Sequence, residues 1–227
     1  MKQKFTILFD LDGTLVDTAP DLMLAHNHVM RKFGYPTKST EDIRNLVGKG
    51  AGALIGRSIW GQAKKEFSKV LDEKIKDEMV KEFVNFYGKN IVNESTLVTG
   101  VKDFLIWCKE QNISMAVCTN KQEHLSNDLL KKIGIYDFFE YVAGSDTFDY
   151  CKPDPRHLTS VVEILDGDVN KTIMIGDSET DANAAKAAEI PVILLENGYT
   201  EKNTTEIYHN HLIKDFIGIE KIISEYL

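Results

Sequence analysis

One stretch near the start of the chain, residues 5–18 (FTILFDLDGTLVDT), constrains its fold most. Residues 5–9 are aromatic, β-branched or leucine, which is typical of a strand covered on both faces of a parallel sheet. Asp10 and Asp12 follow directly, at the end of that strand where open α/β sheets bind their ligands. Gly13 permits a tight turn beside exposed backbone amides. Alone, the pattern also fits an ordinary acidic turn, so the other segments must decide.

Composition narrows the class of protein. The 227 residues carry a formal net charge of −8 and a pI near 5.3, so no overall positive field attracts nucleic acid or an anionic membrane. No apolar run approaches the roughly 20 residues of a membrane-spanning helix, and the start of the chain does not resemble a signal peptide. Cys108, Cys118 and Cys151 lack paired spacing, which favours reduced thiols. We expect a cytoplasmic protein with no nucleic-acid or membrane partner.

Helical periodicity dominates the segment after the first strand. Apolar residues recur at helical spacing and predict helices over about residues 19–34, 39–47, 50–60, 63–71 and 72–89. No strand is predicted between residues 16 and 94. We therefore expect an inserted all-α cap domain over residues 17–94, with residues 1–16 and 95–227 forming the core.

Strands and helices alternate from residue 97 onward. The predicted strands span residues 113–118, 141–143, 172–175 and 191–195, and the predicted helices about residues 101–111, 123–133, 156–165, 180–189 and 217–226. Such alternation indicates a parallel sheet with right-handed crossovers. The expected fold class is α/β, with a Rossmann-like parallel sheet core that has helices on both faces. The first strand joins this sheet across the insertion.

Polar residues end three of the predicted strands. The residues that follow the first, second and fourth strands are Asp10 and Asp12, Thr119 and Asn120, and Asp177 and Asp181. Because parallel strands share one carboxyl edge, these groups converge. A cluster of carboxylates repels itself unless a cation or a proton neutralises it. Oxygen ligands without a nearby pair of histidines or cysteines favour Mg²⁺ over zinc.

A cation and hydrogen-bond donors complete this set. Lys152 lies in a loop made rigid by two prolines and can neutralise a phosphate oxygen or a carboxylate. Thr119 and the amides near Gly13 and Asn120 can donate hydrogen bonds. A carboxylate nucleophile, a second acid, Mg²⁺, a hydroxyl and a lysine are together what phosphoryl transfer through an aspartyl-phosphate requires.

Four motifs in this order resemble those of the haloacid dehalogenase-like hydrolases. They are DLDGTLVD (residues 10–17), VCTNK (117–121), KPDP (152–155) and GDSETD (176–181). The resemblance spans nearly the whole chain and includes a helical cap after the first motif. Within that superfamily, the segments DTAPDL (17–22), VGKG (47–50), TNK (119–121) and GSDT (144–147) are most similar to those of the phosphoglycolate phosphatases.

The resemblance implies a role for each core motif. Asp10 is implied to be the nucleophile, and Asp12 the acid that protonates the leaving oxygen and then activates water. Thr119 and Asn120 are implied to hold the transferring phosphoryl group. The implied Mg²⁺ site comprises Asp10, the backbone carbonyl of Asp12 and Asp177, with Asp181 in the outer shell or orienting the catalytic Lys152.

Substrate recognition is expected to involve the first motif and the cap. Gly13 and Thr14 are candidate substrate-binding residues in the first motif, and Gly48, Lys49 and Arg57 are the candidates in the cap. For the two cap cations, a solvated role with no substrate contact is equally open.

The chain departs from the family pattern at two positions. The cap loop of the family usually has a small polar residue where Lys49 stands, which bears on the choice of substrate. A glycine is usual near Glu189, at the end of a predicted helix.

These features predict a Mg²⁺-dependent phosphatase of a small phosphorylated metabolite, most simply 2-phosphoglycolate. The same fold also admits a sugar-phosphate phosphatase, a phosphoglucomutase-like enzyme or an inorganic pyrophosphatase. A phospho-accepting signalling module of the receiver type uses a similar acid cluster, but it is about half as long and needs neither a cap nor an acid at Asp12. Both a monomer and a homodimer are compatible with the sequence.

Overall fold

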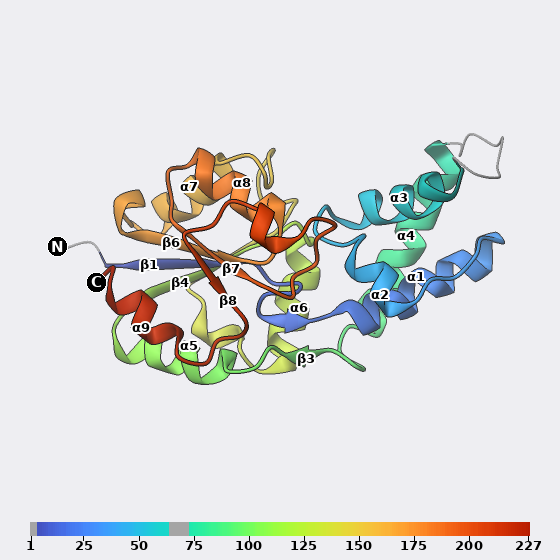
Figure 1. The fold of residues 1–227 in the computed structure, drawn as a ribbon. Helices are drawn as coiled ribbons and strands as arrows, with labels where there is room; N and C mark the ends of the chain where they lie inside the picture. The colour runs from blue at the N-terminus through green and yellow to red at the C-terminus, as the bar shows by residue number, and fades with distance from the viewer. Residues whose placement is uncertain (1–3, 64–72) are drawn as a thin grey trace.

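A parallel β-sheet lies at the centre of the computed structural model, which describes residues 4–63 and 73–227 (Figure 1). Its strands lie in the order β5-β4-β1-β6-β7-β8, and each neighbouring pair is parallel. The strands span Thr6–Phe9 (β1), Ser114–Cys118 (β4), Tyr141–Ala143 (β5), Thr172–Gly176 (β6), Val192–Leu195 (β7) and His211–Ile213 (β8).

Helices cover both faces of this sheet. One face packs against α5, α6 and α9, and the other packs against α7 and α8. These helices span Val101–Glu110 (α5), Glu123–Ile133 (α6), Arg156–Ile164 (α7), Glu179–Ala187 (α8) and Ile219–Ser224 (α9). Short 3₁₀ helices cover Tyr136–Phe138, Val169–Lys171 and Thr204–Glu206. The expected α/β fold class is confirmed.

The first strand lies in the middle of the sheet and is covered on both faces, and its apolar run predicts this cover. β1 pairs with β4 on one side and with β6 on the other, so that Phe9 lies opposite Val117 and Ile175. All four residues of β1 are buried, because Ile7 and Phe9 contact one helical layer and Leu8 contacts the other. The residues that follow β1, β4 and β6 therefore emerge side by side at one edge.

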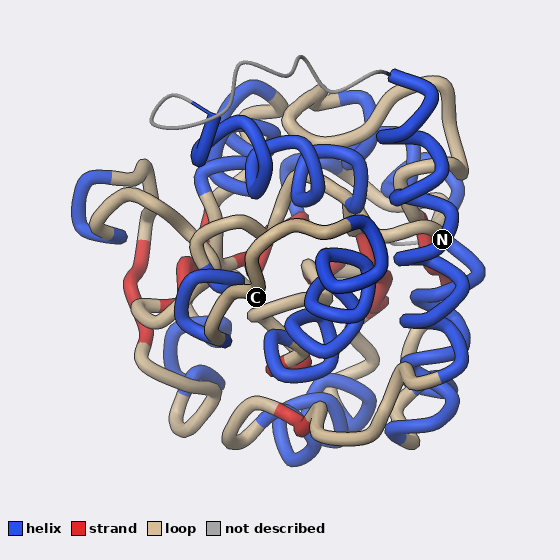
Figure 2. The backbone as a smooth tube through the Cα atoms, turned by 90° about the vertical axis from the view of Figure 1, so that its right-hand side faces the viewer, coloured by secondary structure: helices blue, strands red, loops and turns tan. Residues whose placement is uncertain are grey.

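A block of helices lies beyond the carboxyl ends of the strands, at the right of Figure 1. This helical block comprises Ala19–Phe33 (α1), Thr40–Arg44 (α2), Ala51–Ala63 (α3) and Glu73–Lys89 (α4). α1 packs against α2 and α4, and α3 packs against α4. Figure 2 faces this side of the molecule and shows the strands as short segments among the helices.

Local sequence explains where α1 begins and ends. Pro20 occupies the first turn, where its missing N–H is not needed. Gly34 ends the helix in the left-handed conformation, with φ of 77°. The buried stripe includes Leu22, Ala25 and Val29, at the spacing that predicts one apolar helix face.

Two expectations about this part of the chain need comment. β2 (Val16–Asp17) pairs antiparallel with β3 (Thr96–Leu97), where the two connections between the sheet and the helical block run together. The expectation of no strand after residue 16 is therefore wrong, because a two-residue strand leaves no periodic pattern. The helix expected at about 63–71 falls outside the described residues, apart from Ala63, with which α3 ends.

The edge strand β8 was also absent from the expected elements. Of the strands in the described part of the chain it pairs with β7 alone, and it is only three residues long. No helix in the described part of the chain combines the length and the apolar character needed to cross a membrane.

Candidate active site

Asp10 stands directly after β1 and is held from two sides. Its backbone N–H donates to the carbonyl of Ile175 at 2.9 Å, which extends the pairing of β1 with β6. The Lys152 ammonium nitrogen lies 2.9 Å from Asp10 Oδ1. The Asp10 side chain is only 5% exposed, so its carboxylate has a fixed place in the site.

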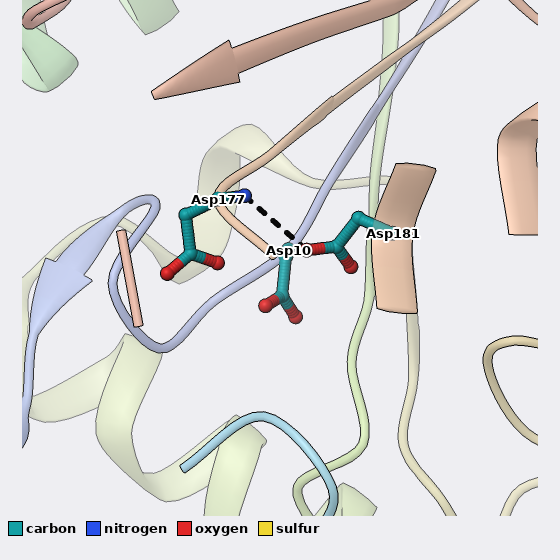
Figure 3. Close-up of side chains that lie close together, drawn as sticks. All are labelled: Asp10, Asp177 and Asp181. Carbon is teal, nitrogen blue, oxygen red and sulfur yellow. Dashed lines mark hydrogen bonds between the residues drawn. The ribbon is translucent and has the colours of Figure 1, made fainter. Parts of the chain in front are cut away.

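Asp10, Asp177 and Asp181 form a buried acidic cluster. Each offers a carboxylate oxygen within 4.8 Å of the others, and Figure 3 shows the three side chains together. Burial raises the pKa of Asp10 to about 6, while Lys152 opposes this rise and the charge of Asp181 adds to it. Burial and the neighbouring carboxylates likewise hold the pKa of Asp177 well above its ordinary value. Oxygen donors that are buried together and repel one another fit a hard divalent cation.

Asp181 orients Lys152. One Asp181 oxygen accepts a hydrogen bond from the Lys152 ammonium at 2.5 Å. The other oxygen accepts from the backbone N–H groups of Asp177 and Ser178 and from the Ser178 hydroxyl; Figure 3 draws the contact with Asp177. Burial alone lowers the pKa of Lys152, but the adjacent Asp10 and Asp181 carboxylates more than reverse this and raise it. Lys152 is therefore a buried, charged ammonium between two carboxylates.

Asp177 is positioned by the first motif and by a loop after β7. One of its oxygens accepts a hydrogen bond from the Thr14 hydroxyl at 3.2 Å, and the other accepts from the Tyr199 backbone N–H at 2.6 Å. Gly13 has φ of 84°, and a Cβ there would clash with the Asp177 carboxylate. The Gly13 N–H itself donates to the Val16 carbonyl. Gly13 and Thr14 thus place Asp177, and neither lines the cavity described below.

Asp12 contacts a lysine that the predicted site residues did not include. Both Asp12 carboxylate oxygens accept from the Lys121 ammonium at 2.8 Å, and one also accepts from the Thr18 hydroxyl at 2.6 Å. The Lys121 ammonium also lies 4.6 Å from the centre of the Tyr87 ring, which belongs to α4. Lys121 follows Thr119 and Asn120 in the same loop, which was the one sequence signal for it.

The loop after β4 supplies a hydroxyl and an amide. Thr119 is buried and lines the cavity, and its side-chain oxygen accepts from the Lys121 backbone N–H at 3.2 Å. The Asn120 side-chain amide donates to the Lys152 carbonyl at 2.9 Å and to the Gly48 carbonyl at 3.1 Å. Asn120 therefore connects two core loops with the loop that leads into α3.

These groups open into a cavity of about 300 Å³ between the sheet edge and the helical block. Its floor includes Asp10, Asp12 and Thr119. Its walls are mostly apolar side chains of α1, α3, α4 and α6, namely Leu22, Ala51, Ala53, Leu54, Val80, Phe83, Val84 and Leu125. Space of this size suits a small molecule.

Lys49 and Arg57 differ in their position relative to the cavity. Lys49 is exposed and lines the cavity next to Gly48. Arg57 does not line it. Its guanidinium donates to the carbonyls of Asn45 and Leu46, at the end of α2, and pairs with the Glu201 carboxylate of the core. Arg57 therefore lies where it joins the helical block to the core.

A second link between block and core runs through Asp17 of β2. Its carboxylate pairs with Arg44 of α2 at 2.7 Å and accepts from the Tyr199 hydroxyl. The Arg44 guanidinium lies 5.3 Å from the Tyr199 ring centre. Tyr199 was not among the predicted residues, although its backbone contacts Asp177 and its side chain contacts the block. No sequence signal pointed to it.

Comparison with known proteins gives a consistent picture. Residues 7–195 match the family of haloacid dehalogenase-like hydrolases. A phosphoglycolate phosphatase of Mesorhizobium japonicum is 36% identical over 221 residues, which cover 97% of this chain and 95% of that protein. A phosphoglycolate phosphatase of Caulobacter vibrioides is 38% identical, over 95% of this chain and 89% of that protein.

Solved structures share the fold. A structure described as a predicted phosphoglycolate phosphatase from Haemophilus somnus superposes with a TM-score of 0.90 at 30% identity, over 98% of this chain and 99% of that chain. A β-phosphoglucomutase from Clostridium difficile gives a TM-score of 0.78 at 23% identity, over 98% of this chain and 97% of that chain. The second likeness concerns the fold alone.

Proposed function

The chain belongs to the haloacid dehalogenase-like hydrolase family and is a phosphoric monoester hydrolase, and from this premise we propose that it hydrolyses 2-phosphoglycolate through an aspartyl-phosphate on Asp10, with Mg²⁺ as cofactor. The substrate is inferred from relatives that are named phosphoglycolate phosphatases. The observation that carries the chemistry is the buried Asp10–Asp177–Asp181 cluster beside Lys152, from which Asp10 reaches the cavity that Asp12 also lines.

The acidic cluster supports the choice of cofactor. Asp10, Asp177 and the backbone carbonyl of Asp12 would hold Mg²⁺, while Asp181, with both oxygens engaged, orients Lys152. Bound there, the cation would offset negative charge on the phosphoryl oxygens. The raised pKa values of Asp10 and Asp177 support this assignment, because a neighbouring cation relieves the repulsion that contributes to them.

Each core residue then has a defined task. A carboxylate oxygen of Asp10 attacks phosphorus, and the bond from phosphorus to the ester oxygen breaks. Asp12 gives a proton to that oxygen and afterwards takes one from the water that hydrolyses the aspartyl-phosphate. Lys152, 2.9 Å from Asp10, and the Thr119 hydroxyl contribute positive charge and a hydrogen bond to the transferring group.

The helical block would act as a cap domain, with residues 17–94 as the cap and residues 1–16 and 95–227 as the core. Two observations support this division. The helices of the block pack against one another beyond the sheet edge, and the block is joined to the core where the two-residue strands β2 and β3 pair. A cap over the cavity would keep bulk water from the reacting groups. Gly48 and Lys49, which line the cavity, would contact the substrate there.

Phosphate release from a panel of phosphorylated metabolites tests this proposal. We expect steady Mg²⁺-dependent turnover of 2-phosphoglycolate, and we expect Asp10→Asn to lower kcat by about 10³-fold or more while circular dichroism stays unchanged. One stoichiometric phosphorylation without turnover would contradict the hydrolase mechanism. Little phosphate release together with a requirement for a bisphosphate activator would instead indicate a mutase.

A further inference from the structure

Lys121 and Tyr87 are two polar groups of the cavity that take no direct part in the proposed chemistry. Lys121 follows β4 in the core, whereas Tyr87 belongs to α4 of the helical block. Both line the cavity, and both are buried, with exposed fractions of 9% and 1%. The Lys121 ammonium lies 4.6 Å from the Tyr87 ring centre, so the core and the block meet at this pair.

Each of the two side chains has hydrogen-bonding capacity to spare. A lysine ammonium carries three N–H donors, and among the described residues the acceptors that Lys121 contacts are the two carboxylate oxygens of Asp12. The Tyr87 hydroxyl is buried and has no hydrogen-bond partner among the described residues. An unpaired buried hydroxyl is costly. Because Tyr87 is one of the residues that line the cavity, a ligand in the cavity can supply the missing partner once it reaches this hydroxyl.

We propose that Lys121 and Tyr87 bind a carboxylate of the substrate, so that the site takes short phosphorylated carboxylates as a class. This inference rests on the proposed function and names the contact that selects its substrate. The carboxylate accepts one hydrogen bond from the third N–H of the Lys121 ammonium and another from the O–H of Tyr87. The cavity walls around the pair are mostly apolar, so the attraction between the Lys121 ammonium and the carboxylate is only weakly screened.

The arrangement of the floor agrees with the shape of such a substrate. Asp10 receives the phosphoryl group, Asp12 serves the ester oxygen, and Lys121 contacts Asp12 on both carboxylate oxygens. In 2-phosphoglycolate the ester oxygen likewise lies between the phosphorus and the carboxylate. The carboxylate also reaches Tyr87 of the helical block, so it holds block and core together. An ester without a carboxylate lacks this contact.

Competition against p-nitrophenyl phosphate hydrolysis tests this subsite. The two competitors are 2-phosphoglycolate and ethyl phosphate, which share a skeleton except that a methyl group replaces the carboxylate. We expect 2-phosphoglycolate to bind at least about tenfold more tightly than ethyl phosphate, the size of a charge-assisted hydrogen bond. An inhibition constant reports binding whether or not the competitor is hydrolysed. If the subsite is wrong, the two inhibition constants are similar; if only the proposed substrate is wrong, 2-phosphoglycolate still binds more tightly but releases no phosphate.

Two variants test whether Lys121 and Tyr87 cause the tighter binding of 2-phosphoglycolate. Lys121→Met should bring the ratio of the two inhibition constants close to one. Tyr87→Phe removes a hydroxyl that has no hydrogen-bond partner among the described residues and therefore should not impair folding. It should weaken the binding of 2-phosphoglycolate by about three- to tenfold and the binding of ethyl phosphate by less than about twofold. Lys131→Met is the matched control, because its ammonium also lies over a tyrosine ring, at 4.8 Å from that of Tyr136, away from the residues that line the cavity.

The outcomes separate a binding role from a structural one. If Lys121 merely holds Asp12, Lys121→Met lowers kcat and leaves the ratio of inhibition constants unchanged, which overturns the proposal. Equal competition by the two compounds in the unaltered protein also overturns it. So does a loss of the preference in Lys49→Met but in neither Lys121→Met nor Tyr87→Phe.

Discussion

The floor and the walls of the active-site cavity are built in different ways. Asp10 of the floor belongs to the acidic cluster, in which each carboxylate has named partners: Asp10 is paired with Lys152, Asp177 is held by Thr14 and Tyr199, and Asp181 is held by Ser178 and Lys152. The walls, which the helical block largely supplies, present side chains such as Leu22 and Phe83 that are held by packing alone.

This difference separates the chemistry from the choice of substrate. Hydrogen-bonded charges in a buried cluster have one favourable arrangement, and removal of any member leaves another member unpaired. Apolar walls tolerate exchanges of similar volume at small cost. The floor should therefore resist substitution, while the walls should accept it.

The largest expected effect comes from removing the buried Lys152 ammonium beside Asp10 of the floor. Lys152→Met leaves Asp10 and Asp181 without their shared cation, so we expect the free energy of unfolding to fall by about 3–5 kcal/mol. The comparison variant is Lys49→Met at the cavity rim, where the side chain is exposed and the expected change is within about 0.5 kcal/mol. Urea denaturation measures both, and equal losses would contradict the contrast.

Two glycines provide a second test. Gly13 has a positive φ and no room for a Cβ beside Asp177, so Gly13→Ala must displace that carboxylate and should lower kcat by about 100-fold. Gly52 lies in α3, and no atom of the described residues lies within 4 Å of a Cβ added there. We expect Gly52→Ala to raise the free energy of unfolding by about 0.5–1 kcal/mol, because alanine favours a helix. A Gly13→Ala enzyme with normal turnover would refute this assignment.

Much of the fold and of the floor could be predicted from the sequence, because both depend on local patterns. The helix Glu123–Ile133 has the predicted bounds, and the polar residues after β1, β4 and β6 converge because parallel strands share an edge. β8 escaped prediction since a three-residue edge strand depends on its pairing with β7. β2 escaped for the same reason, through its pairing with β3.

The contacts of the site that could not be predicted from the sequence are those between distant segments of the chain. The sequence placed Asp12 and Lys121 in neighbouring motifs, but nothing in it showed that the two side chains meet. The amide of Tyr199 reaches Asp177 from a loop without a motif. For Arg57, the residue type suggested a substrate contact, but the direction of a side chain on α3 follows from packing, and it points to Glu201.

Arg57 therefore gives a smaller and more specific effect. Since it does not line the cavity, we expect Arg57→Ala to change the KM for 2-phosphoglycolate by less than about twofold. A double-mutant cycle with Glu201→Ala should give a coupling energy of about 0.2–1 kcal/mol, as for other partly exposed ion pairs. A KM raised about tenfold would instead support a substrate contact, one of the two roles that the sequence left open for Arg57.

A further effect is expected in the core, away from the floor of the cavity. Glu189 ends the turn after α8 with φ of 58° and is exposed. Left-handed backbone is strained for glutamate but not for glycine, so Glu189→Gly should raise the free energy of unfolding by about 0.5–1 kcal/mol. Asn112→Gly is the matched control, because Asn112 has φ of 57° but asparagine tolerates this conformation and should gain less. A loss of stability in Glu189→Gly would contradict this expectation. A gain in stability with unchanged turnover would show that this turn of the core, unlike the floor of the cavity, tolerates substitution.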